Sequence, residues 1–144
     1  MLRAGDAAPG FTLSDQHGHM VQLEEFRGRS LLIYFYPEAD TAGCTKQSCD
    51  VRDHRQDLSG AGMDVVGISP DEPEKQLAFD EKFHLGFPLL ADVDHSVAEA
   101  YGVWNEETQS VRRSSFLVDG DGRIAETWYG VKPMETVPKA LAAI

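Results

Sequence analysis

The chain has 144 residues, of which 42% are hydrophobic and 26% are charged. That length suits one domain, which we expect to span residues 1–144 and to bury a core without staples. The 24 acidic residues outnumber the 13 basic ones and give a net charge of −11, which argues against binding to nucleic acid or to an anionic membrane surface.

We expect no targeting segment in this chain, and it carries few cysteines. No apolar run approaches the ~18 residues of a membrane span, and the start MLRAGDAAPGF lacks the apolar core of a signal peptide. The expected compartment is therefore the cytoplasm. Only Cys44 and Cys49 are present, far fewer than a secreted disulfide scaffold needs. A close pair in a cytosolic chain indicates chemistry more often than a structural bridge.

The first part of the chain predicts a small hairpin followed by a buried strand. Phe11–Leu13 and Val21–Leu23 flank a turn-rich segment that contains Gly18, which favours a hairpin. Leu31–Tyr36 is a continuous apolar run that stops at Pro37. Such a run predicts a strand covered on both faces.

The middle of the chain alternates helical and strand patterns. Thr41–Leu58 is polar with helical composition, and Met63–Ile68 is a second buried strand. Asp71 and, three residues later, Glu74 predict a capping-box variant at the start of a helix that runs toward His84.

The last part continues this alternation. The predicted elements are a strand at Pro88–Ala91, a helix at Ser96–Tyr101, strands at Ser115–Val118 and Ile124–Tyr129, and a closing helix at Pro133–Ile144 that contains Pro138. Asp119–Gly122 is a strong hairpin turn. This order predicts a mostly parallel central sheet with an antiparallel edge and helices on both faces. Sites in such sheets lie beyond the carboxyl ends of strands, so the loop after Tyr36 is the first candidate.

Cys44 follows that loop at the start of the predicted helix. With Thr41 as N-cap, its hydroxyl would accept a hydrogen bond from the Cys44 backbone N–H. Free N–H groups and the helix dipole in the first turn favour a nucleophilic thiolate. The alternative is an inert buried cysteine beside an ordinary cap.

The helical wheel separates the two cysteines. At ~100° per residue, Cys44, Val51 and Leu58 form the one apolar stripe, which must face the protein body. Cys49 lies about 140° away, among polar side chains such as Lys46. Because cysteine usually prefers burial, this position favours a chemical role over accidental placement.

These residues resemble a known motif. Pro37, Thr41 and Cys44 are similar to the Pro-x-x-x-Thr-x-x-Cys motif of peroxiredoxins, and the string from Phe35 to Cys49 resembles the bacterioferritin-comigratory (peroxiredoxin Q) branch. Further blocks in the same order are Gly5–Leu13, Gly67–Asp71, Phe87–Asp92, Tyr101–Trp104 and Arg113–Asp119. Ala42 departs from the branch, which usually has proline there, but this change removes no catalytic group.

The resemblance implies a fold and an activity. The fold is α/β and thioredoxin-like, with an N-terminal β-hairpin extension and a mixed central sheet flanked by helices. The activity is reduction of hydrogen peroxide and organic hydroperoxides without metal, haem or flavin. Cys44 would be the peroxidatic nucleophile and Cys49 the resolving thiol, forming an intramolecular disulfide. Thioredoxin or a glutaredoxin-like dithiol would reduce that disulfide, and the chain would be a monomer or weak dimer.

The resemblance also assigns supporting roles. Arg113 matches the family's arginine in Arg-x-Ser-Phe and would supply a fixed cation, with Thr41 as a second donor to the peroxide. Pro37 would shield the sulfur from water. Arg112 would face the opposite way if the strand has begun there. Without the motif, Arg113 would be interpreted as a solvated residue at a strand edge.

Two other functions remain open. One is a dithiol–disulfide oxidoreductase that acts on proteins, although such enzymes usually carry Cys-x-x-Cys rather than the wider gap between Cys44 and Cys49. The other is a thioredoxin-like binding module without turnover, which the combination of Thr41 and Arg113 disfavours.

Overall fold

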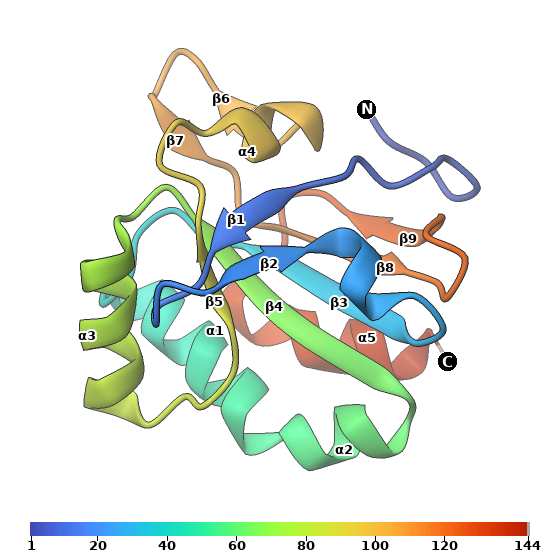
Figure 1. The fold of residues 1–144 in the computed structure, drawn as a ribbon, viewed down its shortest axis with the longest axis horizontal. Helices are drawn as coiled ribbons and strands as arrows, with labels where there is room; N and C mark the ends of the chain where they lie inside the picture. The colour runs from blue at the N-terminus through green and yellow to red at the C-terminus, as the bar shows by residue number, and fades with distance from the viewer. Residues whose placement is uncertain (144) are drawn as a thin grey trace.

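The computed structural model describes residues 1–143, and a seven-stranded sheet of order β2-β1-β5-β4-β3-β8-β9 lies at its centre (Figure 1). Its strands are β1 (Thr12–Ser14), β2 (Met20–Gln22), β3 (Ser30–Phe35), β4 (Met63–Ser69), β5 (Leu89–Ala91), β8 (Ser114–Val118) and β9 (Ile124–Trp128). Strand β4 runs parallel to β3 and β5, and every other pair of neighbours is antiparallel. The prediction of a mixed sheet is confirmed, whereas a mostly parallel sheet is wrong because hairpins occupy both edges.

Helices cover both faces of this sheet. The α-helices are α1 (Ala42–Asp53), α2 (Arg55–Gly60), α3 (Pro73–Phe83), α4 (Ser96–Ala100) and α5 (Thr136–Ala142), with 3-10 turns η1 (Leu23–Phe26) and η2 (Pro133–Glu135). Figure 1 shows α4 beside the small β6 (Trp104–Asn105) and β7 (Ser110–Val111) pair on one side, and α1, α2, α3 and α5 on the other. No helix among residues 1–143 has both the length and the apolar character needed to cross a membrane.

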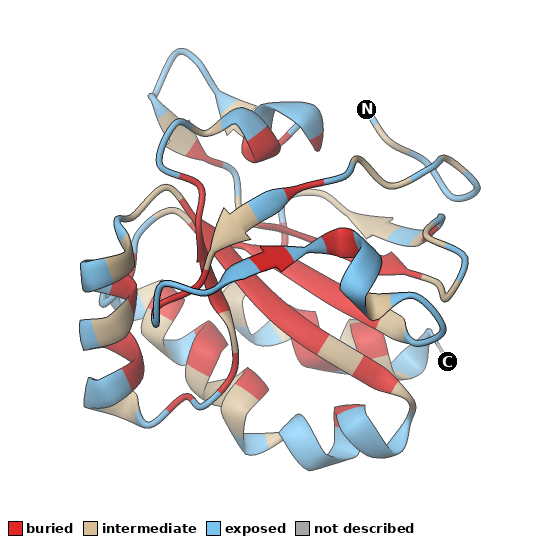
Figure 2. Cartoon of the chain, in the orientation of Figure 1, coloured by how far each residue is buried: buried red, intermediate tan, exposed pale blue. Residues whose placement is uncertain are grey.

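Strand β3 divides the core into two parts. Leu31, Ile33 and Phe35 join an apolar cluster with α4, whereas Leu32 and Tyr34 join a second cluster that includes residues of α1, α3 and α5. This alternation follows from the two-residue period of a strand. Figure 2 shows the result as a buried sheet centre between helices whose outer faces are exposed.

The predicted helix Thr41–Leu58 is interrupted at His54, whose φ of −106° and ψ of 14° separate α1 from α2. The predicted apolar stripe survives the break, since Cys44, Val51 and Leu58 are all fully buried in one cluster. The interruption therefore does not change which side chains of this segment join the core.

Two predicted helix starts are wrong. Glu72, not Asp71, is the N-cap of α3, with Pro73 at the first helical position, because the Asp71 carboxylate accepts hydrogen bonds from Ala39 N and Ser69 Oγ instead. Helix α5 begins only at Thr136, after η2. Pro138 therefore lies in its first turn, where the missing N–H costs nothing. The predicted last residue of that helix, Ile144, lies outside the described residues.

The prediction omitted β6 and β7. Each is only two residues long, and they pair through Trp104–Val111 and Asn105–Ser110. A ladder this short has no hydrophobic period to read, but it leads directly into Arg112 and Arg113. The β6–β7 pair therefore helps to set the position of Arg113, the predicted cation.

Candidate active site

The loop between β3 and α1 is held in place by α3 and by Asp71, which lies just before α3. Ala39 N donates to Asp71 Oδ2 at 2.7 Å, Lys82 Nζ donates to Asp40 Oδ2 at 3.0 Å, and Lys75 pairs with Glu38. Asp40 adopts a left-handed φ of 63°, which reverses the chain before the helix begins. The loop thus delivers the first turn of α1 to the carboxyl end of β3, where the sequence predicts the site.

Cys44 lies in that first turn, and its side chain is buried. It is the third residue of α1, has 0% exposure, and belongs to the cluster that contains Tyr36 and Val51. Both Cys44 and Cys49 are free thiols in this structure. The Cys44 sulfur therefore lies near the free N–H groups of the first helical turn and within an apolar cluster, which is a low-dielectric environment.

Arg113 reaches Cys44 from the opposite side of the loop. The register of β8 on β3 pairs Ser114 with Phe35, so Arg113 lies at the carboxyl end of β3. Its Nη2 donates to Cys44 Sγ at 3.3 Å. Arg112 is exposed and its guanidinium lies against Gly130, so adjacent residues point apart as expected for a chain entering a strand.

The guanidinium of Arg113 also lies close over the helix backbone. A Cβ atom at Gly43 would come within 3.0 Å of Arg113 Nη2 and 3.4 Å of Pro133 Cγ. Any side chain at this position would press on the guanidinium. Glycine at position 43 therefore permits the close approach of Arg113 to the first turn.

Gln47 is a site residue that the sequence analysis missed. Arg113 Nη1 donates to Gln47 Oε1, and Gln47 Nε2 donates to Thr136 Oγ1 at 2.8 Å. The hydroxyls of Thr136 and Ser115 lie 3.2 Å apart. Its position on the helix gives one signal, because residue 47 follows Cys44 by one turn, but its partners are distant in sequence.

The expected hydrogen bond from Cys44 N–H to the Thr41 hydroxyl is absent. Thr41 is the N-cap residue, but its side chain makes no cap bond, and its Oγ1 donates to Glu38 O at 2.7 Å. A short hydroxyl can bond the local backbone instead of the helix, and here it does so. Thr41 is exposed, and Pro37, two residues after the end of β3, is half-buried.

Cys49 is less exposed than the helical wheel predicts. It is half-buried and, like Phe83, packs against the second core cluster, which contains Cys44. Arg52 Nη1 donates a hydrogen bond to Phe83 O at 2.6 Å. The prediction of a polar face is wrong on this side because Cys49 packs against the core cluster that contains Cys44, and Arg52 of α1 bonds to the last residue of α3. The helix therefore buries a wider face than its apolar stripe alone requires.

A buried tyrosine ties α1 to the sheet near both cysteines. The hydroxyls of Tyr34 and Ser48 are 2.8 Å apart, and Tyr34 is fully buried. Burial raises the pKa of Tyr34, and the nearby Cys44 and Cys49 raise it further. Its hydroxyl therefore stays protonated and holds the middle of α1 against β3.

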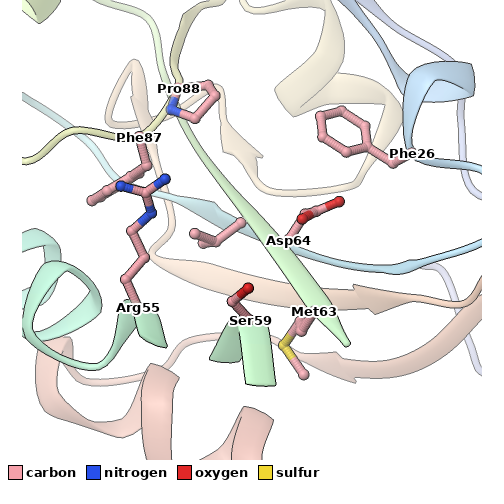
Figure 3. A pocket seen from close by; sticks show the side chains of 8 residues that line it. Phe26, Arg55, Ser59, Met63, Asp64, Phe87 and Pro88 are labelled. Atoms are coloured by element: carbon pink, nitrogen blue, oxygen red, sulfur yellow. The ribbon is translucent and has the colours of Figure 1, made fainter. Parts of the chain in front are cut away.

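A surface pocket elsewhere contains neither cysteine. This pocket of about 270 Å³ is lined by Met63 and Asp64 of β4, Ser59 of α2, and Phe87 and Pro88 (Figure 3). Met63 is the first residue of β4, whereas the loop that leads to Cys44 follows the carboxyl end of the parallel strand β3. The pocket is therefore at the opposite end of the sheet from the cysteine site.

The mixed sheet, with a cysteine-bearing helix after β3, places this chain in the class of thioredoxin-like thiol enzymes. The model of the AhpC/TSA family matches residues 4–127, so the chain belongs to that family. Its relatives are peroxiredoxins of the Bcp and peroxiredoxin Q type, and it is accordingly a thiol peroxidase, an oxidoreductase.

The relatives match over most of their length. Peroxiredoxin Bcp of Escherichia coli (strain K12) is 50% identical over 129 residues, which cover 85% of this chain and 83% of that protein. Peroxidoxin BcpB from Mycobacterium tuberculosis has a TM-score of 0.94 at 31% identity, covering 99% of this chain and 96% of that one. A variant of Xanthomonas campestris Peroxiredoxin Q has a TM-score of 0.90 at 29% identity, covering 99% and 97%. The resemblance and the thioredoxin-like fold expected from the sequence are confirmed.

Proposed function

We propose that the chain reduces hydrogen peroxide and organic hydroperoxides through a two-cysteine cycle, with Cys44 as peroxidatic nucleophile and Cys49 as resolving thiol. The observation that carries this assignment is the 3.3 Å contact of Arg113 Nη2 with the buried Cys44 Sγ at a helix start. A guanidinium and the first helical N–H groups both favour a thiolate there. The same donors can then stabilise the oxygen that leaves.

The first step forms a sulfur–oxygen bond. The Cys44 thiolate attacks one peroxide oxygen, the O–O bond breaks, and the other oxygen departs as hydroxide or alkoxide and takes up a proton. Negative charge moves from sulfur to the leaving oxygen, so donors that reach both atoms lower the barrier. Arg113 has several donors in a rigid fork for this purpose. Thr41 is a weaker candidate than the sequence indicates, because its hydroxyl is turned to Glu38 O.

The second step closes the cycle. The Cys44 sulfenic acid condenses with the Cys49 thiol, forming a disulfide and releasing water. A thioredoxin-like or glutaredoxin-like dithiol then exchanges with the disulfide, which returns both thiols and leaves the reductant oxidised. We propose that this occurs in the cytoplasm, where such dithiols keep cysteines reduced.

A Cys49→Ser protein tests the two-cysteine cycle. We expect it to reduce about one equivalent of peroxide and then to stop with a thioredoxin system, because no intramolecular disulfide can form. Mass spectrometry would find oxidised Cys44 and no internal disulfide. Full turnover at the wild-type rate with thioredoxin would contradict the role of Cys49. Parallel assays of insulin disulfide reduction test the rival dithiol–disulfide oxidoreductase function, which predicts activity without peroxide.

Formation of the disulfide should unwind α1. In a regular helix, residues five apart have Cα atoms roughly 8.7 Å apart, calculated from a rise of ~7.5 Å and a rotation of about 140°. A disulfide needs a Cα separation of about 4.4–6.8 Å, so at least one turn between Cys44 and Cys49 must open. That opening would also break the bonds of Gln47 to Thr136 and of Ser48 to Tyr34.

Amide hydrogen exchange measures this opening. We expect protection from residue 42 to about residue 52 to fall on oxidation, while β3 stays protected. The Cys49→Ser protein is the matched control, because it can be oxidised but cannot close the bond. Oxidised protein with a Cys44–Cys49 bond and unchanged protection in this segment would show that the spacing argument is wrong.

A further inference from the structure

A buried polar chain continues from Arg113 into the C-terminal helix. Gln47, Thr136 and Ser115 have exposed fractions of 0%, 1% and 0%, and their side chains connect to one another by hydrogen bonds. Thr136 is the first residue of α5, far from Arg113 in sequence and on a different element. Thr136 is not one of the motif residues that define the site.

The two hydrogen bonds of the Gln47 side chain can run in only one direction. An arginine side chain donates and never accepts, so the Gln47 oxygen must face Arg113 and its amide nitrogen must face Thr136. The Thr136 oxygen accepts that N–H bond, and its own hydroxyl is within 3.2 Å of Ser115 Oγ. Arg113 therefore sets the orientation of the Gln47 amide, and the Thr136 hydroxyl holds the other end of the amide by accepting its N–H.

The partner that holds Arg113 is neutral. Gln47 supplies an amide oxygen, and none of the ion pairs formed among residues 1–143 involves Arg113. A carboxylate in this place would offset the positive charge that acts on Cys44 Sγ. A neutral amide orients the guanidinium and leaves its charge available to the sulfur, but only while the amide itself is held.

We propose that Thr136 is a positioning residue for the peroxidatic site, acting through Gln47 on Arg113. The inference rests on the roles proposed above for Cys44 and Arg113. Without the Thr136 hydroxyl, the Gln47 N–H₂ group loses its acceptor in a site without water access, which is costly enough to turn or displace the amide. Arg113 then loses Gln47, its one side-chain hydrogen-bond partner other than Cys44 Sγ among residues 1–143.

The test measures the reaction of Cys44 alone. In a Cys49→Ser background, the rate constant for oxidation of Cys44 by hydrogen peroxide is determined for Thr136→Val, Thr136→Ala and Thr136→Ser. We expect Val and Ala, which both lack the hydroxyl, to slow oxidation about 10-fold, and Ser to restore most of the rate. Thr127→Val on β9 is the matched control for the same substitution at a half-buried strand position, and it should leave the rate unchanged.

A second measurement separates positioning from stability. The rate of Cys44 alkylation by iodoacetamide and the melting temperature are measured in the same proteins. In the Val and Ala variants alkylation should be slower than in the Ser variant, because a misplaced Arg113 stabilises the reacting sulfur anion less. A merely structural role for Thr136 would lower the melting temperature of all three variants without changing the alkylation rate.

Arg113→Ala measured in parallel distinguishes the possible failures. If Arg113→Ala is slow but Thr136→Val and Thr136→Ala both react at the wild-type rate, the inference about Thr136 is overturned and the proposed function stands. If Arg113→Ala itself reacts at the wild-type rate, the proposed role of Arg113 fails and the inference fails with it. Slow Val and Ala variants with a restored Ser variant support the inference.

Discussion

Cys44→Ser is expected to abolish peroxide reduction while leaving the fold intact. The substitution exchanges one sulfur atom for oxygen at a fully buried position, so packing against Tyr36 and Val51 should change little. A serine hydroxyl is not ionised near neutral pH, and among residues 1–143 the side chain bonded to this position is the guanidinium of Arg113, which cannot act as a base, so the nucleophile is lost. Peroxide consumption with excess dithiol reductant measures the effect.

Far-ultraviolet circular dichroism and thermal unfolding show whether the serine protein is folded. The Cys49→Ser protein is the matched control, since it retains the first step. A folded Cys44→Ser protein that still consumes peroxide would exclude Cys44 as the peroxidatic residue, and the site would have to be sought elsewhere in the chain.

Arg113→Ala should slow oxidation of Cys44 by about 10²–10³-fold, the range found when one donor that stabilises a developing oxyanion is removed. Two losses combine here. The sulfur loses the donor at 3.3 Å that favours its anion, and the leaving oxygen loses the only arginine in contact with Cys44 among residues 1–143. Stopped-flow measurement of the second-order rate constant with hydrogen peroxide tests the size of the effect.

Arg112→Ala is the control for Arg113→Ala, because it removes the same charge from the neighbouring position. The Arg112 side chain is exposed and its guanidinium lies against Gly130, so its removal should leave the rate within about twofold of wild type. If Arg112→Ala were slow and Arg113→Ala fast, the assignment of the cation to residue 113 would be reversed.

Local patterns were enough to predict the position of Cys44. The apolar run before Pro37 gave β3, and the buried stripe through Val51 and Leu58 gave the orientation of α1. Both depend on periodicity within one segment, which the sequence carries directly. The prediction that Arg113 lies near this helix came instead from the family motif, because no local pattern connects two residues so far apart.

Contacts between distant segments account for the differences. Gln47 was missed because its partners, Arg113 and Thr136, come from other elements. Cys49 was placed on a polar face because its packing against core residues from other elements cannot be inferred from α1 alone. The Thr41 hydroxyl could either accept a hydrogen bond from the Cys44 N–H or donate one to the Glu38 carbonyl. N-cap propensity does not decide between these two partners.

The division of the core by β3 determines which part of the molecule can stay folded during the proposed reaction cycle. The cluster beside α4 shares no side chain with the one that contains Cys44. The proposed opening of α1 would disrupt one cluster and leave the other able to hold the sheet together. We therefore expect α1 to unfold and refold as a local cooperative unit while the rest of the sheet stays folded.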